Sequence, residues 1–141
     1  MTSKKTISAI QTRRKGAAAV EFALTASFLV MLMLGCTDFG RFVYQYVEMS
    51  NAASEGATYG SLHGIAKFGN LGAWTTAVQN AAIGETTSIS LQTSNVTVDG
   101  AAVSTGLCRV TVTQNFQVLI PWPGLPQTVT LTRQVAMPLM P

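Results

Sequence analysis

Glu21 is the residue whose type and position most clearly suggest chemistry. It lies five residues after Gly16, which ends a basic run, and at the start of a stretch that is otherwise apolar. An ionisable side chain near the start of a membrane span is costly, and its default interpretation is a functional group that needs a partner. The alternative is that Glu21 lies in water at the cytoplasmic interface and has no specific role.

Residues that could support catalysis are few. The single histidine, His63, lies in a Gly-rich turn, and the two cysteines are Cys36 and Cys108. The sequence has no Gly-rich phosphate loop, no Cys/His metal spacing and no credible nucleophile–base set. We therefore expect no enzyme activity, no metal and no cofactor. An oxidising compartment would permit a disulfide, but a long helix would hold Cys36 away from the head, so we expect both thiols to be unpaired.

The composition and the charge distribution point to a membrane. Of 141 residues, 48% are hydrophobic and only 11% are charged, whereas ordinary soluble domains carry about 25% charge. The net charge of +3 hides an asymmetry, because the first sixteen residues hold five cations and no acid. These cations are Lys4, Lys5, Arg13, Arg14 and Lys15. A basic head before an apolar run is an orientation signal, whereas a nucleic-acid binder would spread its cations over a folded face.

An uncharged apolar run extends from Phe22 to Thr37. Together with Ala17–Val20 it provides about twenty residues, enough for a helix to cross a hydrocarbon core of ~30 Å. The positive-inside rule then keeps the N-terminus in the cytoplasm and sends the body out. We expect a leader at 1–16, a transmembrane helix at 17–37, an amphipathic continuation at 38–60 and an extracytoplasmic head at 61–141.

A removed export signal is the alternative interpretation of this run. Signal peptidase needs small residues before its cut, and no A-x-A sequence follows the run. The segment Met33–Cys36 is a poor lipoprotein site, and no apolar residues follow directly after Arg13 and Arg14, as a twin-arginine signal would require. The sequence therefore favours an anchor that is retained.

The helical pattern continues beyond the apolar run. Apolar residues recur at helical spacing at Phe39, Phe42, Val43, Tyr46 and Val47. This pattern predicts one helix that continues to about Tyr59, with Gly60 and Gly64 as stop signals.

The sequence around Gly16 resembles the prepilin cleavage site of type IV pilin-like proteins, since a basic run ends at Gly16 and Ala-Ala-Ala-Val-Glu21-Phe22 follows. This resemblance implies cutting between Gly16 and Ala17 by a prepilin peptidase of the inner membrane. The cut would remove all five cations and keep the apolar helix. In a packed filament, Glu21 could then pair with the new terminal amine of a neighbouring copy.

Further motifs resemble the TadE/TadG-like family, minor pseudopilins of the tight-adherence (Flp) pilus machinery. In order along the chain they are Gly16–Leu24, Asp38-Phe39-Gly40-Arg41, Tyr44, Asn51-Ala52-Ala53 and Glu55-Gly56-Ala57-Thr58-Tyr59. Asp38 stands where the family usually has Glu, and Thr58 where it has Arg. We expect Asp38 and Arg41 to form a weak exposed pair or to mark the exit from lipid. The small residues of the later motifs should pack against a sheet, with a specific partner contact as the alternative.

The remaining residues predict an α+β head. A short helix is expected at Trp74–Ile83, strands are expected at 88–92, 95–98, 107–118 and 128–137, and Asp99-Gly100 indicates a hairpin turn. The outer half of the long helix would cover the apolar face of this antiparallel sheet, as in pilins. The prolines of Pro121–Pro126 predict a rigid loop that presents Trp122 to a partner or folds back onto the sheet.

These patterns together predict a minor pseudopilin that takes part in assembly of a tight-adherence pilus. Its partners would be the inner membrane, the prepilin peptidase and other pilins of the same system, with no nucleic acid. It would be a single-pass protein of the bacterial inner membrane with a periplasmic head. The alternative is an unprocessed single-pass envelope protein with an extracytoplasmic binding domain.

Overall fold

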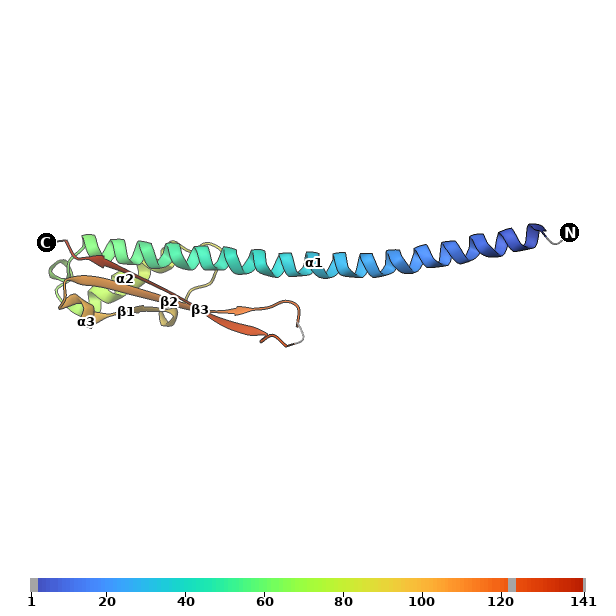
Figure 1. Ribbon diagram of the computed structural model, residues 1–141. Coiled ribbons are helices and arrows are strands. Elements are labelled where there is room, and N and C mark those ends of the chain that lie inside the picture. Colours follow the sequence, from blue (N-terminus) through green and yellow to red (C-terminus); the bar gives the residue numbers. More distant parts are fainter. Residues whose placement is uncertain (1–2, 122–123, 141) are drawn as a thin grey trace. The chain divides into compact units, whose positions relative to one another are not determined.

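A computed structural model of the chain describes residues 3–121 and 124–140, with side chains described from residue 16 onward. It has two compact units, Met1–Phe39 and Gly40–Pro141. Helix α1 (Ser3–Leu62) supplies the described part of the first unit and continues into the second (Figure 1). The second unit adds a small sheet and shorter helices, so the fold is α+β with a long N-terminal apolar helix, as the sequence predicts.

Helix α1 is longer than expected at both ends. It begins at Ser3 and passes through Gly16, although the sequence suggested a helix from Ala17. It also passes through Gly60, so the prediction that this glycine stops the helix is wrong. The helix ends at Leu62, shortly before Gly64, whose backbone is extended with ψ 158°. The second glycine therefore acts as the stop signal, and Gly60 has another role in packing.

The sheet of the described chain has three antiparallel strands in the order β1-β2-β3. Strands β1 (Val96–Val98) and β2 (Leu107–Gln117) pair with Val98 opposite Val110, and β2 pairs with β3 (Thr128–Pro138) with Val110 opposite Val135. Buried residues alternate along β2 at Cys108, Val110 and Val112, which gives the sheet one apolar face. The two long strands lie within one residue of the predicted bounds.

Helix α2 (Leu71–Gly84) confirms the expected short helix. Its N-cap is Asn70, whose side-chain oxygen accepts a hydrogen bond from the Ala73 amide at 2.8 Å. Trp74, Val78 and Ala82 are its buried residues, spaced four apart on one side of the helix. A 3₁₀ turn at Ile65–Lys67 connects α1 to α2.

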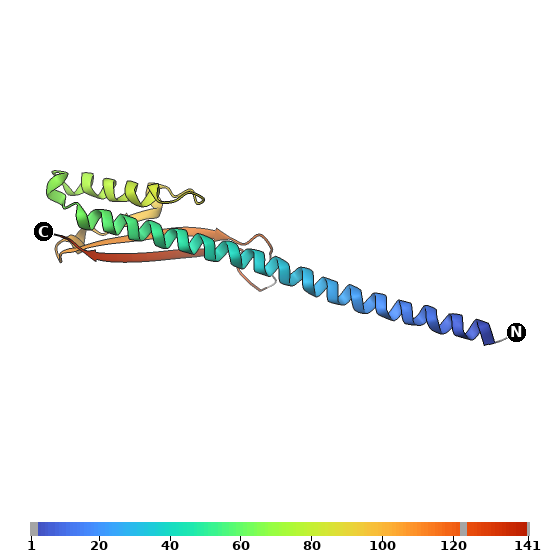
Figure 2. The ribbon, with the colours of Figure 1, turned by 90° about the horizontal axis from the view of Figure 1, so that it is seen from above.

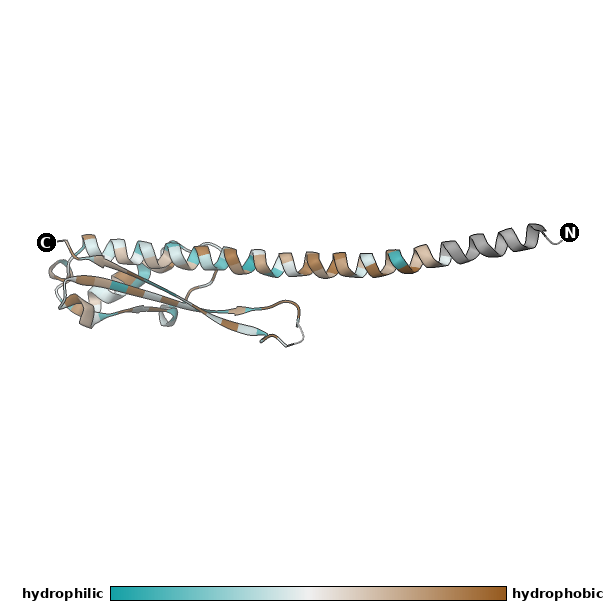
Figure 3. Cartoon of the chain, viewed as in Figure 1, coloured by the Kyte–Doolittle hydropathy of each residue, from teal (hydrophilic) through white to brown (hydrophobic). Residues whose placement is uncertain are grey.

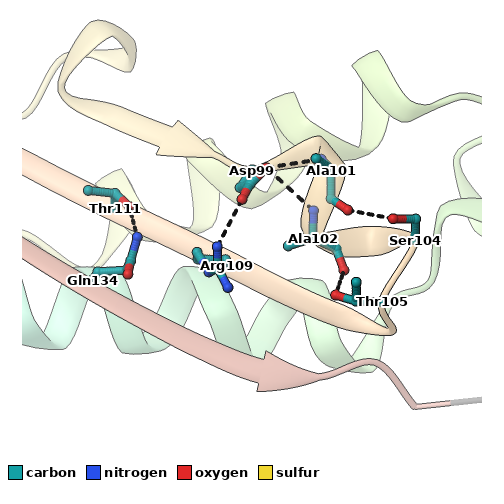
Figure 4. Close-up of polar contacts among 8 residues, drawn as sticks. All are labelled: Asp99, Ala101, Ala102, Ser104, Thr105, Arg109, Thr111 and Gln134. Atoms are coloured by element: carbon teal, nitrogen blue, oxygen red, sulfur yellow. Dashed lines mark hydrogen bonds and ion pairs between the residues drawn. The ribbon is translucent and has the colours of Figure 1, made fainter.

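Two local predictions in the head are wrong. The segment 88–92, described throughout, is irregular and not a strand, and β1 begins only after a 3₁₀ turn at Thr93–Asn95. Asp99-Gly100 does not form a hairpin turn, because Asp99 caps the short helix α3 (Gly100–Val103) (Figure 4). Its Oδ1 accepts from the Ala101 amide at 2.9 Å, and its Oδ2 pairs with Nη1 of Arg109 at 3.2 Å. An Asp that can turn the chain can equally cap a helix, and the ion pair favours the cap.

The core of the second unit lies where α1 and α2 cover the apolar face of the sheet. In the view of Figure 2, α2 lies alongside the C-terminal part of α1. The core joins side chains of α1, α2, the sheet and the irregular segment before β1: Met49, Ala52, Ala53, Ala57, Trp74, Val78, Ala82, Leu91, Val96, Cys108, Val110, Val112, Phe116 and Leu131. Figure 4 also shows Gln134 on the sheet, whose Nε2 donates to the Thr111 hydroxyl at 3.0 Å. The long strands are thus joined by side chains as well as by their backbones.

Candidate assembly surface

The first unit is a helix whose described side chains are largely exposed. Helix α1 is long and apolar enough, from Gly16 to Leu62, to cross a membrane, and its most apolar 18-residue window contains no buried residue. In Figure 3 the apolar colouring of α1 is concentrated in the middle of the helix. The hydroxyls of Thr25, Ser27 and Thr37 each donate to the carbonyl four residues earlier, at 2.8–2.9 Å. These bonds satisfy the hydroxyls inside the helix, as a lipid environment requires.

The residues of the predicted processing site lie on this exposed helix. Gly16, Ala17 and Glu21 are exposed, and Phe22 is 74% exposed. A Cβ added at Gly16 would meet nothing within 4 Å. The side chains of the orientation signal Arg13, Arg14 and Lys15 fall outside the described residues, as does Trp122. The exposed site is therefore available to a partner, and its proteolytic role stays a prediction.

In the second unit, α1 has two different faces. Its inner face consists of small residues and one methionine, buried against the sheet and α2: Met49, Ala52, Ala53, Gly56, Ala57 and Gly60. Its outer stripe, which we define as Gly40, Val43, Tyr44 and Val47, is exposed, with Val43 at 40% and Val47 at 49%. The outer half of α1 thus covers the sheet as expected, but Val43 and Val47 of its apolar stripe face away from the sheet.

Close backbone approach explains why the small residues face inward. A Cβ added at Gly56 would lie 3.0 Å from the Ala82 Cβ. At Gly60 it would overlap the Cys108 sulfur and lie 3.1 Å from Cζ2 of Trp74. Any larger residue at these two positions would push α1 away from the head. The expected packing of the small-residue motif is confirmed.

Aromatic and cationic contacts join the beginning of this α1 segment to the sheet. The Phe42 ring meets Phe116 edge-on with 5.6 Å between centroids, and the Arg41 guanidinium lies 5.5 Å from the Phe116 centroid. Further along, Nη1 of Arg133 donates to the Tyr46 hydroxyl at 3.3 Å. Phe42 and Tyr46 therefore point to the sheet, while Val43 and Val47 stay outside.

Glu48 is a structural residue that sequence reasoning missed. Its Oε1 accepts from the Ser88 amide at 3.1 Å and from the Thr87 hydroxyl at 3.3 Å, and the Tyr44 hydroxyl lies 2.9 Å from that of Ser88. These contacts hold the segment that was expected to be a strand. A lone acid on an amphipathic helix gives no signal of a partner forty residues away.

The other motif residues divide between surface and interior. Asp38 is only 7% exposed, which contradicts one of its two expected roles, a weak exposed pair with Arg41; its role at the exit from lipid stays a prediction. Phe39, Asn51 and Glu55 are exposed, while Tyr59 is half-buried and stacks on His63 with 4.4 Å between ring centroids. On the outer face of α1 the side chains are polar from Asn51 onward, so the apolar outer stripe ends at Val47.

The thiols and acids of the described chain suggest no site for a metal. Cys36 and Cys108 are free, Cys36 exposed and Cys108 buried. Burial raises the pKa of the Cys108 thiol to about 11, which keeps it protonated and unreactive at neutral pH. From residue 16 onward, outside the gap at 122–123, the described side chains include no group of three His, Cys, Asp or Glu able to hold a metal ion.

An exposed apolar helix that continues into an α+β head defines a class of protein compatible with a single membrane pass. Residues 16–58 match the family model TadE, described as TadE-like protein. The resemblance to the TadE-like family is therefore confirmed for this segment. No curated protein and no solved structure matches the chain.

Proposed function

We propose that this chain is a minor pseudopilin that takes part in assembly of a tight-adherence pilus. The TadE-like match supports a role in that pilus system. The single observation that carries the proposal is the exposed surface of α1, which presents large apolar side chains from Val20 to Leu34 and continues in the outer stripe. Apart from the Tyr44 hydroxyl, which contacts Ser88, the described chain does not cover this surface, so it needs lipid or neighbouring helices. Lipid can cover only the transmembrane part, so the outer stripe is proposed to pack against another subunit.

Processing between Gly16 and Ala17 would prepare this helix for assembly. Gly16 lies within α1, so the peptidase must open the helix locally, and glycine opens at a cost about 0.5–1 kcal/mol lower than alanine would. The cut removes the five cations that hold the leader in the cytoplasm. The head then lies in the periplasm, and the apolar helix stays in the inner membrane.

Glu21 and Phe22 would act after the cut. The new α-amino group at Ala17 lies four residues, or about 6 Å of helix rise, before the Glu21 carboxylate. Within lipid both charges are costly, so pairing Glu21 of one subunit with the amine of another would lower the cost of both and fix their relative height. The exposed Phe22 ring would contact the neighbouring helix at the same level.

Intact-mass measurement after co-expression with a prepilin peptidase tests this proposal. The expected product begins at Ala17 and forms only when the peptidase is present. Gly16→Leu should abolish the cut, whereas the matched control Gly40→Leu should be cut normally. A Cβ meets nothing within 4 Å at either glycine, so neither change should disturb the fold. A full-length product in the presence of an active peptidase would overturn the processing step.

A further inference from the structure

The loop that joins β2 to β3 carries an exposed apolar surface. We call this surface the hairpin tip and define it as Leu119, Ile120, Pro121, Leu125 and Pro126. Leu119 is 62% exposed and Leu125 is 65% exposed. No Asp, Glu, Lys or Arg occurs between Arg109 and Arg133, so the tip and the adjoining ends of both strands are uncharged. Exposed leucines on an uncharged loop indicate an apolar partner.

The hairpin tip lies at the end of the second unit where the chain leaves for the membrane helix. Phe116, near the end of β2, contacts Arg41 and Phe42 at the beginning of this unit. The hydrogen bond from the Val118 amide to the Gln127 carbonyl, at 2.9 Å, closes the hairpin just before the tip. The tip therefore extends from the end that carries Arg41, and α3 lies at the opposite end of the strands.

Chain length keeps this end close to lipid at any angle between the two units. The uncharged apolar run ends at Thr37, and Arg41 is the fourth residue after it. Four residues span at most about 14 Å even when fully extended. The loop 119–126 has eight residues, and half of it can span about the same 14 Å. The tip can therefore reach a membrane surface at the level of Thr37.

We propose that the hairpin tip inserts into the interfacial layer of the bilayer that α1 crosses. Leucine and isoleucine side chains gain by leaving water there, and the tip has no charge that would oppose insertion. Its prolines have no backbone N–H, so fewer donors lose water on insertion. Arg41 lies over the Phe116 ring, three residues before the tip, and would place a cation at headgroup level.

This second point of attachment would restrict the orientation of the head on the membrane. A head held by α1 alone can turn in any direction about its connection, whereas two contacts on one surface leave rotation about a single axis. The inference requires the membrane span but neither the processing step nor the pilus role. Its failure would therefore leave the proposed function intact.

Depth-dependent quenching on the full-length protein in phosphatidylcholine vesicles tests the inference. Leu125→Cys is labelled with an environment-sensitive fluorophore in a Cys36→Ser background, where the buried and protonated Cys108 does not react. Ala101→Cys, which is exposed on α3, is the matched control. The parent Cys36→Ser protein, carried through the same labelling, measures any reaction at Cys108.

Insertion predicts a blue-shifted emission at position 125 and quenching by nitroxide lipids several times stronger than at position 101. Iodide in the water phase should quench position 101 more strongly. Equal iodide quenching at both positions would overturn the proposal. Protection of position 125 from both iodide and nitroxide lipids, seen only at a high protein-to-lipid ratio, would also overturn the proposal. A second copy of the chain would then cover the tip.

Discussion

Replacing Gly60 by alanine tests the close packing that joins α1 to the head. The new methyl group would overlap the Cys108 sulfur and lie 3.0 Å from Cγ2 of Val78 and 3.1 Å from Cζ2 of Trp74. Trp74 cannot move easily, because its indole N–H donates to the His63 carbonyl at 2.6 Å. Overpacking of this kind costs typically 1–3 kcal/mol.

The helix propensity of alanine offsets part of this cost. Alanine is favoured over glycine in a helix interior by about 0.5–1 kcal/mol. The upper half of the overpacking range applies at Gly60, because three side chains converge there, so the net loss should be about 1–2 kcal/mol. At Gly40 a Cβ meets nothing within 4 Å, so Gly40→Ala should be stabilising by up to about 1 kcal/mol.

The assay is urea unfolding of the full-length protein in detergent micelles. The chain has two tryptophans, and replacing Trp122 by phenylalanine makes Trp74 the only reporter of the core. Adding Cys108→Ala to Gly60→Ala removes the nearest obstructing atom, so the double variant should lose less stability than the sum of the two single variants. A Gly60→Ala protein as stable as Gly40→Ala would refute the close approach of α1 to β2 and α2.

Two further predictions concern β2 and its surroundings. The Cys108 pKa is raised from 9.0 to about 11, so the folded state favours the protonated thiol; its contribution is complete below pH 9 and is lost as the pH rises toward 11. Unfolding of the wild type at pH 8 and pH 10.5 should show an extra loss of up to about 2 kcal/mol that Cys108→Ala lacks, and equal losses would contradict the buried thiol. Asp99→Ala should destabilise by about 1–2 kcal/mol in the same assay through loss of the helix cap, whereas Asp99→Asn should keep most of the stability because the ion pair with Arg109 is partly exposed. Equal losses in the two Asp99 variants would mean that the ion pair is the stronger contact.

The sequence predicts the parts of the fold that depend on periodicity. The long helix, α2 and the two long strands follow from apolar spacing of 3.6 or 2, which tertiary contacts reinforce here. Prediction from the sequence fails where one residue type can serve two purposes. Glycine at position 60 can end a helix or allow close packing of a neighbouring element. Only the folded positions of Trp74 and Cys108 show that Gly60 allows close packing.

The candidate site shows the same division. Exposure of Gly16 and Glu21 follows from an apolar helix without local partners, and the family motif locates them along the chain. The direction of the outer stripe could not be predicted, because Phe42 and Val43 are equally apolar in the sequence. Their separation depends on the Phe116 ring and on the small inner face of α1, which let α1 approach the sheet with Val43 and Val47 outward. Glu48 acquires its partners only through folding of the 87–88 segment.

Site-specific photocrosslinking in cells that express a complete tight-adherence system tests the central claim most directly. A photoreactive residue at Val47, on the outer stripe, is compared with one at Thr97, which is exposed on β1. If α1 assembles with neighbouring helices, position 47 should form adducts that mass spectrometry maps to the N-terminal helix of another pilin-like subunit, and position 97 should not. Adducts absent at position 47, or equal at both positions, would contradict assembly through α1.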